Sequence, residues 1–200
     1  MWWRDLRGTW RRKGAVARLA RFGGLAAALA AASFTAGCFQ PLYSSHPVVG
    51  TTATEGVGDK LAAVDIPVIA APEGSPLQRI AVGLRNALQY DLNGAAGARA
   101  PTHRLVVNVG DTQWTITIDP ASGRPSAEIA AITADYQLIE IATGKTVMHA
   151  NTFAHVDYDI PGVEQRFAKQ RAQRDAEDHA VLIVADTIKN RLASYFVAGT

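Results

Sequence analysis

The chain contains a single cysteine, Cys38, among its 200 residues. A thiol can bind a metal, form a disulfide or act as a nucleophile. A lone cysteine forms no disulfide within its own chain, and it cannot build a cysteine-rich zinc site. Cys38 follows a basic stretch and an uncharged, apolar run at residues 22–36. That preceding segment therefore decides which chemistry we expect of the thiol.

The segment before Cys38 has the pattern of a secretory signal. Its apolar run, residues 22–36, has about 15 residues, whereas a bilayer span needs about 20. The small residues Thr35, Ala36 and Gly37 then precede the cysteine, and "TAGC" resembles the lipobox of bacterial lipoproteins. This resemblance implies cleavage between Gly37 and Cys38, lipidation of the thiol with diacylglycerol, and acylation (palmitate) of the new N-terminus. The alternatives are an ordinary signal peptide with an incidental cysteine, or a short signal anchor.

Charge divides the chain at the same place. Seven of the twenty basic residues and one of the eighteen acidic residues lie in residues 1–37, so the remainder carries a net charge of about −4. That remainder gives no reason to expect nucleic-acid binding. We predict a lipoprotein signal peptide at 1–37, a flexible tether rich in Pro, Gly, Ser and Thr at 38–59, and a single α+β domain at 60–200.

Hydrophobic periodicity predicts the elements of this domain. A strand is expected over residues 60–70, followed by a helix that Ser75 caps and Gly94 ends. Three strands follow, with a bulge at Gly110–Asp111, and short turns join them into an antiparallel meander. A long helix is last. Two amphipathic helices and four strands in the order β-α-β-β-β-α predict an α+β two-layer sandwich on a small, mainly antiparallel sheet. The expected later elements are strands at 103–119, 127–144 and 145–162 and a helix at 163–196.

The last predicted helix has two unlike halves. The first half is highly charged, and its segment "RDAEDH" at Arg174–His179 is expected to be a solvated face with charge pairs inside the helix. The second half is amphipathic. Its expected apolar stripe consists of Ala180, Ile183, Val184, Thr187, Ile188, Leu192 and Tyr195.

No set of residues in the domain predicts catalysis or a metal site. "ATGKT" at 142–146 lacks the further glycine that a phosphate loop needs, and we expect a hairpin turn there. His149 and His155 lie about 20 Å apart on one predicted strand, too far to share a metal. Asp157 and Asp159 share a strand face and could do acid–base work or bind a cation. No third ligand or nearby histidine is apparent in the sequence, so we expect solvated carboxylates at the end of a strand. We therefore expect no enzyme activity, no cofactor and no metal.

Four segments resemble one known family in their order and spacing. They are "GCFQPLY" at 37–43, "LRNAL" at 84–88, "ADYQLIEIATGK" at 134–145 and "QRDAEDHAVLIVADTIKNRLASYF" at 173–196. Together they resemble the LPS-assembly lipoprotein family (LptE-like, alphaproteobacterial type). The resemblance extends from about residue 24 to the end of the chain.

This resemblance implies a location, a function and partners. The protein would be anchored by its lipid in the outer membrane, facing the periplasm and the lumen of a large outer-membrane β-barrel, the LPS translocon. It would act as plug and assembly partner of that barrel and would contact lipopolysaccharide. Arg124 and Lys145, at two predicted turns, are candidate contacts for lipid A phosphates. The alternative is a lipid-anchored periplasmic binding module, or a hydrolase of the cell envelope.

Overall fold

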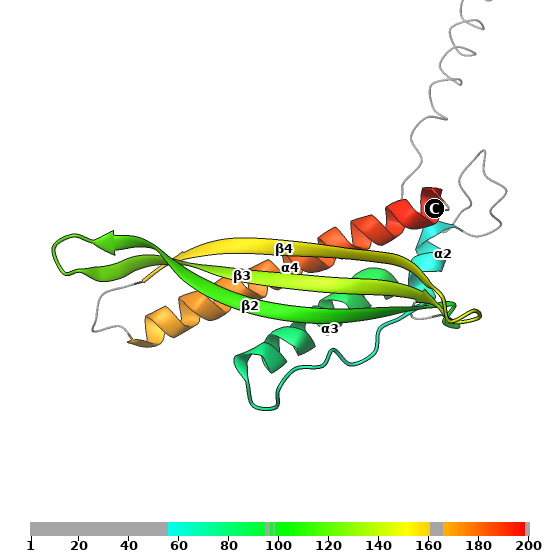
Figure 1. The fold of residues 1–200 in the computed structure, drawn as a ribbon, viewed down its shortest axis with the longest axis horizontal. Helices are drawn as coiled ribbons and strands as arrows, with labels where there is room; N and C mark the ends of the chain where they lie inside the picture. The colour runs from blue at the N-terminus through cyan, green and yellow to red at the C-terminus, as the bar shows by residue number, and fades with distance from the viewer. Residues whose placement is uncertain (1–55, 95–96, 98, 161–165, 199–200) are drawn as a thin grey trace, which may run out of the picture. The chain divides into compact units, whose positions relative to one another are not determined.

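The domain is a four-stranded sheet with helices on one face (Figure 1). A computed structural model describes residues 56–94, 97, 99–160 and 166–198. The strands lie in the order β1-β2-β3-β4, with β1 parallel to β2 and the other pairs antiparallel. This arrangement confirms the predicted α+β two-layer sandwich. The elements are α2 (Val57–Ala62), β1 (Val64–Asp65), α3 (Pro76–Asn93), β2 (His103–Asp119), β3 (Arg124–Glu140), β4 (Thr146–Asp159) and α4 (Arg166–Ala198).

The first described element is a helix, so the strand predicted over 60–70 is wrong except at β1. Val57 and Leu61 lie one helical turn apart in α2, and both are buried. Strand pairing ends at Asp65, two residues before Pro67, which has no N–H to donate to a ladder. Ile66 and Ile69 nevertheless contribute to the core from the segment after β1, which is not part of the sheet.

Helix α3 begins and ends where local signals place it. The Ser75 hydroxyl oxygen accepts a hydrogen bond from the Gln78 backbone N–H at 3.3 Å, and Pro76 occupies the first helical position. Gly94 ends the helix with φ of 55°. Its buried residues recur every three or four positions, as on one face of an amphipathic helix. They are Ile80, Ala81, Leu84, Leu88 and Leu92.

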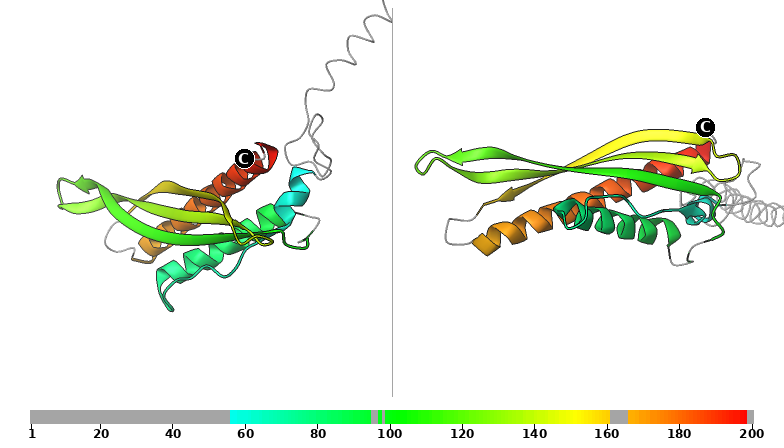
Figure 2. Two further views of the ribbon diagram at one scale, coloured as in Figure 1. Left: turned by 45° about the vertical axis from the view of Figure 1, so that its right-hand side comes forward. Right: turned by 60° about the horizontal axis from the view of Figure 1, so that its bottom comes forward.

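Strands β2 and β3 form one long hairpin, paired from His103–Glu140 to Asp119–Arg124. The bulge predicted at Gly110–Asp111 is wrong, because Gly110 pairs directly with Thr133 and the register shifts lie farther out, around Thr117. Gly110 instead provides space: a Cβ atom there would lie 2.7 Å from the Thr133 hydroxyl oxygen. The hairpin continues past the ends of the helices (Figures 1 and 2).

Helix α4 packs against the sheet and α3, but its buried face is rotated from the predicted stripe. Ile183 and Thr187 are exposed, whereas Val181 and Ala185 are buried. Small side chains at 185 and 193 are fully buried on the observed face, and their weak apolarity does not mark that face in the sequence. The buried residues are Ala176, Glu177, Ala180, Val181, Val184, Ala185, Ile188, Leu192, Ala193 and Phe196.

Candidate functional site

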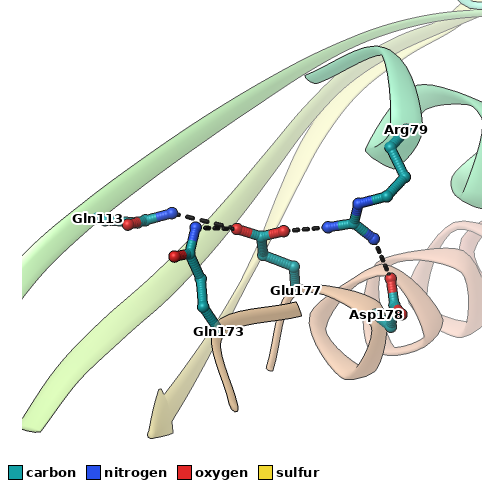
Figure 3. Close-up of polar contacts among 5 residues, drawn as sticks. All are labelled: Arg79, Gln113, Gln173, Glu177 and Asp178. Carbon is teal, nitrogen blue, oxygen red and sulfur yellow. Dashed lines mark hydrogen bonds and ion pairs between the residues drawn. The ribbon is translucent and has the colours of Figure 1, made fainter. Parts of the chain in front are cut away.

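A polar cluster connects α3, α4 and β2 beneath the sheet (Figure 3). We call it the Glu177 cluster. Glu177 is 1% exposed, and its carboxylate is ion-paired with Arg79 of α3. It also accepts hydrogen bonds from the side-chain amides of Gln113 at 3.1 Å and Gln173 at 2.8 Å. The same Arg79 guanidinium is paired with Asp178. The buried charge is therefore satisfied from three elements.

Glu177 corrects the prediction that Arg174–His179 is a solvated face. The residue continues the buried side of α4 one turn before Ala180. Its cationic partner, Arg79, is 98 positions away in sequence, so charge spacing inside α4 does not reveal the pair. The signal available in the sequence is geometric: a buried stripe at 180, 184 and 188, extended backward by three or four positions, reaches 176 and 177.

Asp111 of β2 lies beside the Glu177 cluster. Its Oδ1 atom is buried without a hydrogen-bond partner in the part of the chain that the structure describes. Burial raises the pKa of Asp111, and the nearby negative charge of Glu177 raises it further, while Arg79 acts in the opposite direction. Ionisation of Asp111 therefore lowers the stability of the folded protein.

A second polar group fixes the first turns of α4 to the end of the sheet. The Tyr158 hydroxyl donates to Glu128 at 2.6 Å, and the Lys169 ammonium donates to the other oxygen of that carboxylate at 3.0 Å. Burial acts to raise the pKa of Glu128, but these two donors outweigh it, and the pKa is lowered. Burial and the neighbouring Glu128 raise the pKa of Tyr158. Each of these three polar side chains already has a partner, so the contacts hold α4 to the sheet and leave no reactive side chain free.

The sheet face opposite the helices carries a row of aromatic rings. Trp114 of β2 and His155 of β4 meet with ring centroids 5.3 Å apart, and Phe153 lies 5.0 Å from His155. Ala131, the register partner of His155 on β3, is 1% exposed. Trp114 and Phe153 remain 43% and 65% exposed. The sequence analysis did not predict that β2 and β4 bring these rings together over Ala131 of β3.

The two predicted lipopolysaccharide contacts, Arg124 and Lys145, lie far apart. Arg124 begins β3 at the outer turn of the β2–β3 hairpin, and Lys145 lies in the turn between β3 and β4. The 17 residues of β3 separate them, about 55 Å at about 3.4 Å per residue. One lipid A headgroup therefore cannot contact both residues. Each remains a separate prediction.

The other candidate residues show no assembled site. The segment 142–146 forms the predicted hairpin turn, in which the Gly144 N–H donates to the Glu140 carbonyl at 2.8 Å. The side chains that the sequence analysis weighed for metal binding or acid–base work, His149, His155, Asp157 and Asp159, are all exposed along β4. In the described ranges, no three histidine, cysteine, aspartate or glutamate side chains are grouped so that they could hold a metal ion.

The predicted lipidation site lies outside the described residues. Cys38, the cleavage position after Gly37 and the predicted tether at 38–59, except for its last four residues, belong to the part of the chain that the structure leaves undescribed. Among the helices in the described part, none combines the length and apolarity needed to cross a bilayer.

Comparison with known proteins identifies the fold. No family model matches the chain, and no curated protein matches it. A solved structure of a candidate lipoprotein from Caulobacter crescentus superposes with a TM-score of 0.54 at 20% identity, covering 72% of this chain and 97% of that one. The rare lipoprotein B of Shewanella oneidensis superposes with a TM-score of 0.48 at 18% identity, covering 68% of this chain and 96% of that one. The chain shares the fold of the Caulobacter protein.

Proposed function

We propose that this chain is an outer-membrane lipoprotein that acts as plug and assembly partner of the LPS-transport β-barrel. The observation that carries the proposal is a pairing of two features. A lipobox-like "TAGC" ends at Cys38, and the domain that follows shares its fold with a candidate lipoprotein over 97% of that protein's length. The four segments that resemble the LPS-assembly lipoprotein family add the barrel and lipopolysaccharide as partners.

The polar residues of the domain support a non-catalytic role. The carboxylates of Glu128 and Glu177 are held by cationic and amide or hydroxyl donors. Only the buried Oδ1 of Asp111 lacks a donor among the described residues. The exposed carboxylates, Asp157 and Asp159, lie along a sheet edge with their carboxyl groups in solvent. General acid–base work needs an acid and a base held near one reacting atom.

The anchor is tested with Cys38→Ala in the full chain. We expect wild type to fractionate with the outer membrane and to yield an N-terminal peptide with diacylglycerol and acyl mass, and the variant to leave the membrane pellet. A matched control, Thr35→Leu, alters the same segment but keeps the thiol, and it should be lipidated. Membrane retention of Cys38→Ala with no lipid detectable on wild type would contradict the anchor.

The partner is tested by affinity purification of the full chain from detergent-solubilised outer membranes. We expect a large β-barrel protein to be recovered with the chain at a defined ratio, and depletion of the chain to lower the amount of that barrel. Recovery of small soluble proteins alone would contradict the plug role while leaving the lipid anchor intact. Hydrolytic activity abolished by Asp157→Asn would instead favour the enzyme alternative.

A further inference from the structure

The two halves of α4 are attached to the rest of the domain by different kinds of contact. Among the described side chains at 167–179, only Ala176 and Glu177 are buried, and Phe167 is 81% exposed. From residue 180 onward, buried side chains recur along the helix and belong to the main core. The second half is therefore fixed by apolar packing that the first half lacks.

The apolar contacts of the first half form a small cluster separate from the main core. Its buried members are Ala130, Tyr158 and Ala176, and Val156, Ile160 and Ala172 pack against it only partly buried. Both residues that α4 contributes are alanines, whose side chains are single methyl groups, so their burial contributes little free energy. Regions with few buried apolar contacts open locally at low free energy.

Polar contacts hold this half of α4 against the sheet and α3. Lys169 donates to Glu128 of β3, and Glu177 is paired with Arg79 of α3. The side chains of Arg79 and Lys169 are 38% and 40% exposed, so water competes for both cations. Ion pairs that water reaches contribute less free energy than their number suggests.

Asp111 of β2 acts against the closed position of this half. It pairs with Ile132 of the core, so its side chain lies on the helix-facing side of the sheet. Its Oδ1 atom is buried and has no donor in the described ranges, and the charge of Glu177 acts on the same carboxylate. Opening would give this oxygen a water donor and would move Glu177 away.

We propose that residues 167–178 of α4 form a strap that opens from the sheet as a unit, while residues 180–198 stay packed, and that Asp111 favours the opening. A helical segment of this length is marginally stable in water without packing, so the open strap also loses helical hydrogen bonds. Opening exposes Ala176 and the helix-facing side of the sheet around Ala130. The proposal does not rest on the proposed function, because it requires only these contacts.

Thiol labelling tests the strap in the full chain. Ala176→Cys places a thiol beneath the strap, and Ala185→Cys is the matched control, because both alanines are buried on α4. Labelling by iodoacetamide is read from the mass of the peptide that carries each position, so Cys38 does not interfere. We expect labelling at 176 to be at least about a hundredfold faster than at 185. Equal rates, or slower labelling at 176, would overturn the proposal.

Substitutions in the two halves separate local opening from unfolding of the whole domain. Ile188→Val weakens the main core, so it should speed labelling about fivefold at 185 and leave the rate at 176 unchanged. Tyr158→Phe removes a donor from Glu128 and should speed labelling at 176 about tenfold. If Ile188→Val speeds both positions equally, the helix opens only as a whole and the proposal is wrong.

The role of Asp111 has its own measurement in the Ala176→Cys chain. Asp111→Asn removes the charge while keeping the shape of the side chain, and it should slow labelling at 176 about threefold. An unchanged or faster rate would contradict the part of the proposal that concerns Asp111.

Hydrogen exchange of the unmodified chain is a second measurement that needs no cysteine variant. The backbone amides of residues 171–178 should exchange at least about a hundredfold faster than those of residues 182–192. Low concentrations of urea should accelerate exchange less steeply in the strap, because a local opening exposes less surface than global unfolding. One urea dependence shared by both regions would overturn the proposal.

Discussion

Replacing Arg79 with methionine removes the cation that is paired with the buried Glu177. Breaking a fully buried ion pair costs about 3–5 kcal/mol, because the remaining charge has lost its partner in a poorly solvated place. The Arg79 side chain is 38% exposed, so water enters when it is removed, and the amides of Gln113 and Gln173 still donate to the carboxylate. We therefore expect about 2 kcal/mol of lost unfolding free energy, or about 6 °C in Tm.

The assay is urea unfolding followed by circular dichroism, with two comparison variants. Arg104→Met breaks an ion pair with Asp65 whose side chains are 53% and 37% exposed, and it should cost below about 1 kcal/mol. Adding Glu177→Gln to Arg79→Met removes the buried charge itself, and at least half of the loss should return. If Arg79→Met costs no more than Arg104→Met, or if Glu177→Gln gives no recovery, the reasoning about a buried unpaired charge is refuted.

Three further substitutions test contacts of the sheet. Gly110→Ala places a methyl group against the Thr133 hydroxyl and should cost about 1–2 kcal/mol in urea unfolding; Thr133→Ala in the same chain should restore stability, and equal loss with or without it would contradict the steric cause. Asp111 has a raised pKa, so the stability it contributes is full below its ordinary value of 3.8 and is lost as pH rises through the folded value. Asp111→Asn should therefore raise Tm at pH 7 but not at pH 3, and an equal rise at both would refute the electrostatic cause. Tyr158→Phe removes one donor from Glu128 and should cost about 1.5 kcal/mol; NMR titration should show the Glu128 pKa rising, and an unchanged pKa would contradict the hydrogen bond.

Local signals in the sequence predicted the elements whose ends are set by their own residues. Helix α3 is an example, because Ser75, Pro76 and Gly94 fix its ends without any distant contact. Strand β2 is another, with the same bounds in the prediction and in the structure. The two-layer class followed from the order of these elements.

The features that sequence reasoning missed depend on distant contacts or on small differences of angle. Helix α2 lacks a side-chain cap and lies beside a segment rich in glycine, so packing of Val57 and Leu61, not propensity, makes it helical. In α4 the buried face is rotated so that Val181 and Ala185 are buried in place of Ile183 and Thr187, and alanine is a weak hydrophobic signal in a sequence. The partner of Glu177 lies in another helix, so a charged residue there indicates solvent until the fold is known.

The outer part of the β2–β3 hairpin can change in length independently of the core. From Thr112 to Ile118 the β2 side chains are exposed, and the hairpin continues beyond α3 and α4 (Figure 2). Removing or adding one residue in each strand near the turn would leave every pair closer to the helices with the same partner and on the same face. Hairpin length can therefore vary in steps of residue pairs, while the sandwich that anchors the hairpin keeps its core unchanged.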